Sequence, residues 1–126
     1  MILGIGIDVV HPDRIRRWQG IDGLLDRYFH PDELQQCRAR GKSGFLSLAA
    51  RFAAKEAFGK ALGTGLAGLA LREMAVMNDS VGKPELRLEG SAQAAFQRIG
   101  GSRAFVSLTH ERAAVLAMVV IEGSVA

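Results

Sequence analysis

The chain has 126 residues, of which 48% are hydrophobic and only three are proline, and this composition excludes a disordered or low-complexity protein. Its length suits one core, so we expect residues 1–126 to form a single domain. The 16 Lys and Arg against 13 Asp and Glu form no dense basic tract, and only 6% of the residues are aromatic. This modest positive charge suits an acidic partner or a phosphorylated small molecule better than nucleic acid.

Membrane and secreted classes are also disfavoured. The longest strongly apolar run, residues 113–121, has about half the length of a membrane-spanning helix, and residues 1–10 lack the basic region of a signal peptide. We therefore expect a cytoplasmic protein that does not bind membranes. Cys37 is the only cysteine, so it can form no internal disulfide, and we expect its role to be structural.

Residues 1–10 predict a β-strand whose two faces differ. Alternation places four apolar side chains on one face: Leu3, Ile5, Ile7 and Val9. The other face carries Gly4, Gly6 and then Asp8, so it has almost no side chains before the carboxylate. Glycines on a strand face indicate that another element approaches the backbone closely.

Three helices are predicted to follow. The first spans about 13–19, and the second spans 29–39, with Pro31 at a plausible first helical position. The third and longest runs over about 43–62 and ends at the Gly-Thr-Gly turn of residues 63–65.

The second half of the chain predicts mostly strands. Strands are expected at about 71–77 and 85–88, a helix at 91–99, and an antiparallel hairpin of 103–109 and 113–122. Residues 113–121 are apolar on both faces, which is typical of a central strand.

The long helix combines a smooth face with charges at its flank. At 100° per residue, one side gathers small or apolar side chains: Leu46, Ala50, Ala53, Ala54, Ala57 and Ala61. Glu56 and Lys60 lie beside this alanine face, where a carboxylate is partly desolvated and needs a cation. Two interpretations stay open: an ordinary i, i+4 pair of Glu56 with Lys60, or a meeting of Glu56 with Asp8 at the end of the glycine-lined strand.

The second interpretation predicts a metal site. Two carboxylates in a poorly solvated place raise each other's pKa unless a cation lies between them. Mg²⁺ is the natural candidate, because it takes one or two protein carboxylates and fills its octahedron with water and phosphate oxygens. Zinc is disfavoured, since the sequence shows no His or Cys cluster. Lys60, Lys55 and Arg51 lie on the right helix to contact the phosphates.

Several other residues have both a structural and a ligand-binding interpretation. Gly63 ends the helix, but its turn can also bring backbone N–H groups to a ligand. Lys83 and Pro84 belong to an ordinary turn that can also present a cation, and His110 stands at the rim of the predicted sheet. Neither GIGIDVV nor GKALGTG has the glycine spacing of a nucleotide-binding motif.

Four stretches together resemble one family: GIGIDVV, FAAKEAFGKALGTG, GKPELRLEG and SLTHERAAVLAMVVIE. In order and spacing they resemble the holo-[acyl-carrier-protein] synthases, the short bacterial 4′-phosphopantetheinyl transferases. The resemblance implies an α+β fold in which an antiparallel sheet packs against one long helix and shorter helices. It also implies transfer of the 4′-phosphopantetheine group from coenzyme A to a serine of apo-acyl carrier protein, with release of adenosine 3′,5′-bisphosphate, in fatty acid biosynthesis and lipid metabolism.

The resemblance assigns the catalytic residues position by position. Asp8 and Glu56 match the positions that hold Mg²⁺ against the pyrophosphate of coenzyme A. Lys60 would offset charge that develops on the leaving phosphate, together with the metal. The base that takes the serine proton stays open between a metal-bound water and Glu56.

The resemblance also implies how coenzyme A is bound. Arg51 and Lys55 match the helix face near the nucleotide phosphates, and Gly63 matches a turn that a ligand approaches closely. Four residues match the nucleotide side of a neighbouring subunit: Lys83, Pro84, Thr109 and His110. The longer members of the superfamily fuse two such halves, so the resemblance implies a homotrimer with sites between subunits for this shorter chain.

Arg14 matches a position in the first helix of the family, and Arg17 lies one turn further on. Both residues are expected to meet acidic groups of the carrier protein, and a merely solvated basic helix is the alternative. The chain departs from the usual family pattern at His11-Pro12 and His30-Pro31, which are helix starts and not metal positions. A nucleotide- or protein-binding module without catalysis is the alternative function, and it would need no second carboxylate facing Asp8.

Overall fold

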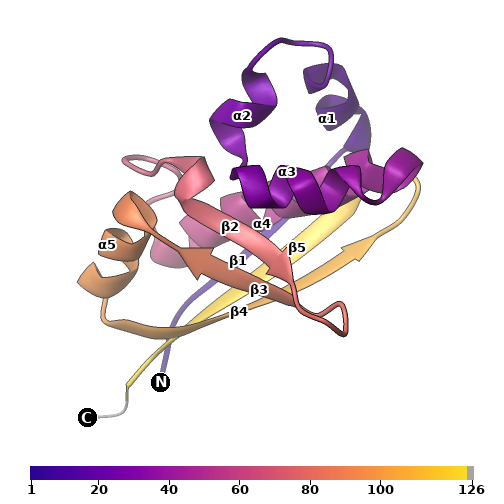
Figure 1. Ribbon diagram of the computed structural model, residues 1–126. Helices are drawn as coiled ribbons and strands as arrows, with labels where there is room; N and C mark the ends of the chain where they lie inside the picture. The colour runs from indigo at the N-terminus through magenta and orange to yellow at the C-terminus, as the bar shows by residue number, and fades with distance from the viewer. Residues whose placement is uncertain (125–126) are drawn as a thin grey trace.

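A three-stranded antiparallel sheet crossed by one long helix forms the frame of the fold (Figure 1). In the computed structural model, which describes residues 1–124, the strands lie in the order β1 (Ile2–Val10), β5 (Val115–Gly123) and β4 (Gly101–His110). The helix is α4 (Gly44–Leu62). β5 is the central strand, which confirms the prediction from its two apolar faces.

A second antiparallel sheet pairs β2 (Met74–Asn78) with β3 (Pro84–Leu88). The remaining elements are short: α1 (Pro12–Trp18), α2 (Leu24–Tyr28), α3 (Pro31–Arg38), α5 (Gly90–Arg98) and the 3₁₀ turns η1 (Gly41–Ser43) and η2 (Leu71–Glu73). This arrangement confirms an α+β fold with antiparallel strands, one long helix and shorter helices. Within residues 1–124, no helix combines the length and the apolar character needed to cross a membrane.

Two local predictions were incomplete. Helix α2 was not predicted, because five residues are too few for a helical period to appear in the sequence. The strand expected at 71–77 begins only at Met74, since residues 71–73 form η2. There the carbonyl oxygen of Leu71 accepts hydrogen bonds from Lys55 Nζ at 2.9 Å and from the Met74 N–H, so both of its lone pairs are used and none is left for a sheet partner.

The glycine-lined face of β1 packs directly on the backbone of α4. A Cβ atom on Gly6 would overlap the carbonyl oxygen of Ala57, and one on Gly4 would overlap that of Ala61. Both alanines are buried. The predicted close approach is therefore confirmed: the bare strand face and the alanine face of α4 allow the two main chains to touch.

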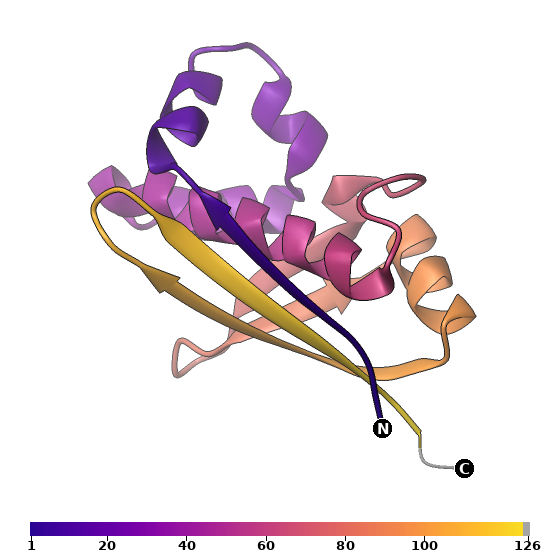
Figure 2. The ribbon, with the colours of Figure 1, turned by 180° about the vertical axis from the view of Figure 1, so that it is seen from behind.

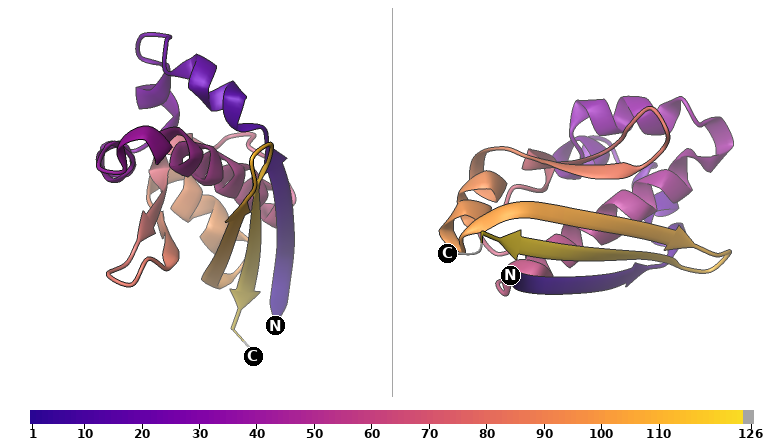
Figure 3. Two further views of the ribbon diagram at one scale, coloured as in Figure 1. Left: turned by 90° about the vertical axis from the view of Figure 1, so that its right-hand side faces the viewer. Right: turned by 90° about the horizontal axis from the view of Figure 1, so that it is seen from below.

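The opposite face of the large sheet carries exposed apolar side chains. Figure 3 (left) shows the helices on one side of this sheet, and Figure 2 shows the strands from the other side, with α4 behind them. Four residues of β1, β5 and β4 contribute large exposed side chains there: Ile5, Ile7, Met118 and Phe105. The register places Ile7 beside Met118 and aligns Ile5 with Val120 and Phe105, so these side chains form one continuous face.

Two histidines and one glycine define helix ends. His11 Nδ1 accepts a hydrogen bond from the Asp13 N–H at the start of α1, and His30 Nδ1 accepts one from the Asp32 N–H at the start of α3. In both places the histidine is the N-cap residue, in place of the more common Ser, Thr, Asp or Asn, and the following proline is at the first helical position. Gly63 ends α4 in the left-handed conformation, with φ of 85°.

Candidate functional site

The end of β1 and the last turns of α4 bring Asp8, Glu56 and Lys60 together. Lys60 Nζ donates a hydrogen bond to Asp8 Oδ1 at 2.9 Å and another to the carbonyl oxygen of Ile7 at 3.1 Å. The Asp8 side chain is only 17% exposed, so this ion pair is partly shielded from water. Of the two interpretations left open by the sequence, the ordinary Glu56–Lys60 helix pair is not the one observed, because Lys60 turns to Asp8.

Glu56 is left as a half-buried carboxylate near a second carboxylate. Among residues 1–124 its side chain has no hydrogen bond or ion pair. Burial raises the pKa of Glu56, and the charge of Asp8 raises it further, while Arg14 and Lys60 partly oppose the shift. Ionisation of a carboxyl group is unfavourable when the group is desolvated, has no cationic partner and lies near another acid.

The residues present fit a hard divalent cation. Asp8 and Glu56 supply two carboxylates from rigid elements, and no larger group of His, Cys, Asp and Glu suited to a metal is found in the described part of the chain. Two carboxylates are the protein share that Mg²⁺ commonly takes, leaving other positions to water and phosphate oxygens. A cation there would give Glu56 the partner that it lacks.

A cavity of about 520 Å³ lies at the other edge of the large sheet, between the N-terminal half of α4, the β2–β3 turn and the end of β4. Five of the predicted coenzyme A residues line it: Arg51, Lys83, Pro84, Thr109 and His110. The family resemblance implies Arg51 on one subunit's phosphate face and the other four residues on a neighbour, whereas one chain brings all five together. The cavity combines basic side chains with a turn whose backbone a ligand can reach, and this combination suits an anionic nucleotide.

Several polar residues of this cavity were not predicted: Arg40, Ser43, Ser47 and Asn78. Arg40 and Ser43 lie in the connection around η1, and Ser47 is in the first turn of α4. Their spacing in the sequence carries no motif, so only the folded position of α4 beside the β2–β3 turn reveals them. The signal that was available is the basic and hydroxylic composition of residues 38–47.

Arg51 is held in a fixed orientation at the wall of the cavity. Its Nε donates to the carbonyl oxygen of Val76 at 2.8 Å, one terminal nitrogen donates to Gln36 Oε1 at 2.7 Å, and the other donates to Ser47 Oγ. The side chain is only 2% exposed. A ligand can therefore reach at most an edge of this guanidinium.

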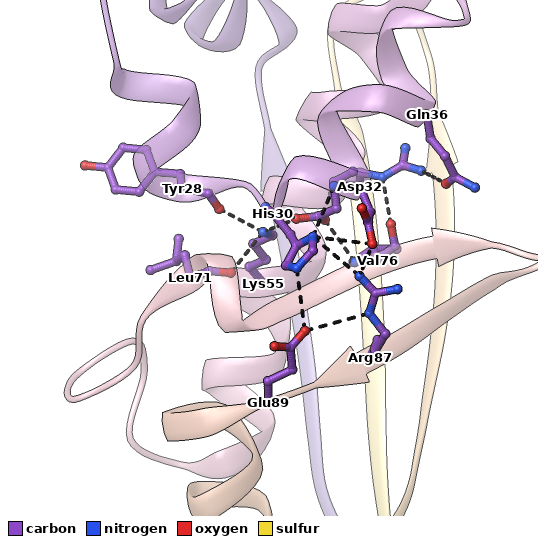
Figure 4. Close-up of polar contacts among 11 residues, drawn as sticks. Tyr28, His30, Asp32, Gln36, Lys55, Leu71, Val76, Arg87 and Glu89 are labelled. Atoms are coloured by element: carbon purple, nitrogen blue, oxygen red, sulfur yellow. Dashed lines mark hydrogen bonds and ion pairs between the residues drawn. The ribbon is translucent and has the colours of Figure 1, made fainter.

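Lys55 does not lie at the cavity surface, and its predicted contact with nucleotide phosphates needs correction. Its ammonium group is fully buried and donates to Glu33 Oε1 at 2.6 Å, to the carbonyl oxygen of Tyr28 at 2.8 Å and to that of Leu71 at 2.9 Å (Figure 4). Burial lowers the pKa of Lys55 to about 8, against the opposing charge of Glu33. All three donors are used, so Lys55 ties α4 to the segments around it.

The carboxylate pair and the cavity lie at opposite edges of the same sheet. In the strand register, Asp8 on β1 is opposite Ala117 on β5, and Ala117 is opposite Leu108 on β4, which lines the cavity. Neighbouring strands are about 4.8 Å apart, so the two edges are separated by roughly 10 Å of sheet. Gly63 lies one turn beyond Lys60 and is not among the residues that line the cavity.

The two predicted carrier-binding residues lie on α1, near the carboxylates. The guanidinium of Arg14 lies 5.2 Å from the ring centre of Trp18 and 5.1 Å from that of Phe52. Its charge reaches Glu56, where it opposes the rise of the pKa. Arg17 is exposed one turn further along α1.

The fold is that of the 4′-phosphopantetheinyl transferases, as comparisons with known proteins show. Residues 4–117 match the sequence profile of the 4′-phosphopantetheinyl transferase superfamily. A holo-[acyl-carrier-protein] synthase of Treponema denticola is 50% identical, over 98% of this chain and all of that protein. The chain therefore belongs to the holo-[acyl-carrier-protein] synthase family.

Solved structures of this family share the fold. The holo-[acyl-carrier-protein] synthase of Neisseria meningitidis has a TM-score of 0.86 and 38% identity, covering 97% of this chain and 99% of that one. A synthase from Bacillus anthracis, solved in complex with coenzyme A (3′,5′-ADP), has a TM-score of 0.81 and 32% identity, covering 98% of this chain and 99% of that one.

Proposed function

We propose that this chain transfers the 4′-phosphopantetheine group of coenzyme A to a serine of apo-acyl carrier protein, giving holo-acyl carrier protein and adenosine 3′,5′-bisphosphate. The observation that carries the proposal is the meeting of Asp8 with Glu56, a carboxylate that has no hydrogen bond or ion pair within residues 1–124. Nearly the whole chain is similar to synthases of this name. The Bacillus anthracis relative, solved with coenzyme A, supports the choice of substrate. Residues 1–126 act as one transferase domain.

Asp8 and Glu56 would hold a Mg²⁺ ion at the pyrophosphate of coenzyme A. Such an ion neutralises phosphate charge and polarises the bond to the leaving group. Lys60 already lies at Asp8, so its ammonium group can move to a phosphate oxygen when a cation takes its place at the carboxylate. The chain's own contribution is therefore to orient the pyrophosphate and to stabilise charge on it.

We propose that the complete site lies between subunits of a homotrimer. The carboxylates of one chain and its basic cavity lie at opposite edges of the sheet, so the sheet stands between them. One extended ligand would therefore contact the carboxylates of one subunit and the cavity of its neighbour. The exposed apolar face of β1, β5 and β4 is suited to subunit contact: Ile5, Ile7 and Val9 are 56%, 57% and 61% exposed. Arg51 then joins Lys83, Pro84, Thr109 and His110 on the neighbour's side.

The acidic carrier protein would dock on α1. Arg14 and Arg17 are exposed on this helix, and Arg14 lies close enough to Glu56 to link docking with the catalytic centre. Attraction between a basic helix and an acidic partner speeds encounter and orients the partner. We place the reaction in the cytoplasm and in fatty acid biosynthesis, and the free thiol of Cys37 fits a reducing compartment.

Mass spectrometry of the carrier tests the proposal. The protein is mixed with coenzyme A, MgCl₂ and an apo-acyl carrier protein, and the carrier is expected to gain the mass of phosphopantetheine. Glu56→Gln should abolish this gain, whereas Glu85→Gln, which changes an exposed acid on β3, should preserve it. Absence of modification with both fatty-acid and polyketide carriers would overturn the proposal, and binding of coenzyme A without transfer would indicate a binding module instead.

A further inference from the structure

Helix α3 carries two polar side chains one turn apart that each bridge α4 and β2. Glu33 accepts hydrogen bonds from Lys55 Nζ on α4 and from the Val76 N–H on β2, at 2.6 and 2.9 Å. Gln36 repeats the arrangement one turn later, with Arg51 on α4 and Asn78 on β2. The first bridge is fully buried, and the second ends at the cavity.

The carboxamide of Gln36 makes three hydrogen bonds at this point. Its Oε1 accepts from an Arg51 terminal nitrogen at 2.7 Å and from the Asn78 N–H at 3.2 Å, and its Nε2 donates to the Asn78 carbonyl oxygen at 3.3 Å. Gln36 therefore pairs with both backbone groups of Asn78, much as a neighbouring strand would. At the same time it fixes one edge of the Arg51 guanidinium.

This position connects two walls of the cavity. Arg51 and Asn78 both line the cavity, but Gln36 does not. Asn78 is the last residue of β2, and it pairs with Pro84 at the start of β3, so the turn between them carries Lys83. Within that turn Asp79 Oδ1 accepts from the Lys83 N–H at 2.9 Å, which holds the turn as one unit. A shift of Asn78 therefore moves Lys83 and Pro84 relative to Arg51.

We propose that Gln36 is a positioning residue for the nucleotide end of coenzyme A. It acts without touching the ligand, by setting the distance between the Arg51 guanidinium and the Lys83–Pro84 turn. The inference rests on the proposed function, since it takes the basic cavity as the place where the phosphorylated nucleotide binds. A polar group is required at this place, because an apolar side chain leaves one arginine donor and both backbone groups of Asn78 without partners.

The test compares Gln36→Met with Gln35→Met in the full-length enzyme. The two glutamines are neighbours on α3, but Gln35 is exposed, so its replacement is a matched control. Gln36→Met is expected to raise the KM for coenzyme A and the Kd for adenosine 3′,5′-bisphosphate about tenfold, or about 1.4 kcal/mol. The kcat and the KM for the carrier should stay within about twofold of the wild type, since the carboxylates and α1 are not altered.

A double-mutant cycle with Lys83→Met separates positioning from general destabilisation. Lys83 is exposed, so its replacement should not impair folding. If Gln36 acts by placing Lys83, the double variant binds adenosine 3′,5′-bisphosphate more tightly than the product of the two single effects predicts. Equal losses in kcat and in both KM values, or fully additive effects, would overturn the inference. A wild-type protein that binds neither coenzyme A nor the bisphosphate would overturn the proposed function along with it.

Discussion

Lys60 is paired with Asp8 across the strand–helix contact and not with Glu56 on its own helix. The Nζ to Oδ1 distance is 2.9 Å, and the same ammonium group also donates to the carbonyl oxygen of Ile7. In this arrangement Lys60 is ion-paired with a carboxylate that a metal ion would need as a ligand. The free protein thus holds an internal cation at the place where a ligand-bound cation would enter.

Replacing Lys60 is therefore expected to separate metal binding from catalysis. Lys60→Gln should tighten Mg²⁺ binding, because Asp8 loses its internal competitor, while kcat should fall by about 10²–10³-fold, because charge on the leaving phosphate is less stabilised. Mg²⁺-dependent thermal shifts and steady-state rates measure the two effects. Arg72→Gln, which removes an exposed cation in η2, is the control. Weaker Mg²⁺ binding in Lys60→Gln would contradict the competition.

Replacing Glu56 should abolish transfer and, at the same time, make the metal-free protein more stable. The pKa of Glu56 is raised in the folded state, mainly by burial and then by Asp8, so the ionised form opposes folding. Glu56→Gln is expected to raise the Tm by about 1–2 °C at pH 7, a small effect because the group is half-exposed. Mg²⁺ should raise the Tm of the wild type but not that of this variant.

The difference in stability between Glu56→Gln and the wild type should depend on pH with a definite sign. Between the unfolded pKa of Glu56 and its higher folded value, the folded state binds more protons, so the wild type loses stability as pH rises through this window. The stability advantage of Glu56→Gln over the wild type should therefore be absent below pH 4.5 and grow as pH rises above 4.5. It should become constant above the folded pKa of Glu56. Denaturant unfolding without Mg²⁺ measures this, and an advantage that shrinks with rising pH would show that the sign is wrong.

Gly6→Ala is expected to destabilise the protein severely. The new Cβ would overlap the carbonyl oxygen of Ala57, which is a main-chain atom and cannot rotate away as the end of a side chain could. A loss of about 3 kcal/mol or more in the free energy of unfolding follows, measured by urea denaturation. Gly20→Ala is the matched control, since its Cβ would make only ordinary contact at 3.6 Å. Equal stability of the two variants would refute the close-approach interpretation.

Charge reversal on α1 should weaken carrier binding selectively. Arg17→Glu is expected to raise the KM for the carrier by about fivefold to tenfold at low salt, with the KM for coenzyme A unchanged. The effect should shrink as ionic strength rises, because exposed charges are screened. Arg98→Glu on α5 changes the net charge equally without altering α1 or the exposed apolar face of the large sheet. If both variants lose the same carrier affinity, α1 is not the docking surface.

The proposed trimer is tested by placing a charge on the exposed apolar face. Ile7→Glu should convert the oligomer to monomers in light-scattering chromatography, because burial of an unpaired carboxylate between subunits is costly. Transfer activity should fall with it, since the proposed site needs two chains. Val81→Glu changes a residue that is 85% exposed in the β2–β3 turn, away from this face, and should leave the oligomer intact.

The local pattern of the sequence was enough to predict most elements, but it left the meeting of Glu56 with Asp8 as one of two open interpretations. The Gly4-Gly6-Asp8 alternation and the alanine face of α4 are complementary periodic signals, so their contact could be inferred before the structure was seen. The direction of Lys60 could not, because spacing alone favours the i, i+4 partner. What decided it was the position of β1, which brings Asp8 within reach.

The residues predicted least well were those whose partners are distant in sequence. The helix face that Lys55 shares with Arg51 predicts a phosphate ligand, but the Lys55 ammonium group is paired inside the protein with Glu33, 22 residues earlier. The cavity residues Arg40 and Ser47 were missed for a similar reason, since only the folded chain brings them beside the β2–β3 turn. Resemblance to a family supplied residue roles, but not which of these residues are buried.

The contact between the glycines of β1 and the carbonyl oxygens of α4 has a consequence for evolution of this enzyme. Asp8 and Glu56 are borne by two main chains that touch directly, so their separation does not depend on the size of any core side chain between them. Substitutions elsewhere in the core, such as at Phe58 or Val119, can change overall stability while the two carboxylates keep their spacing. The hydrophobic core can thus drift in sequence more freely than the four small residues Gly4, Gly6, Ala57 and Ala61.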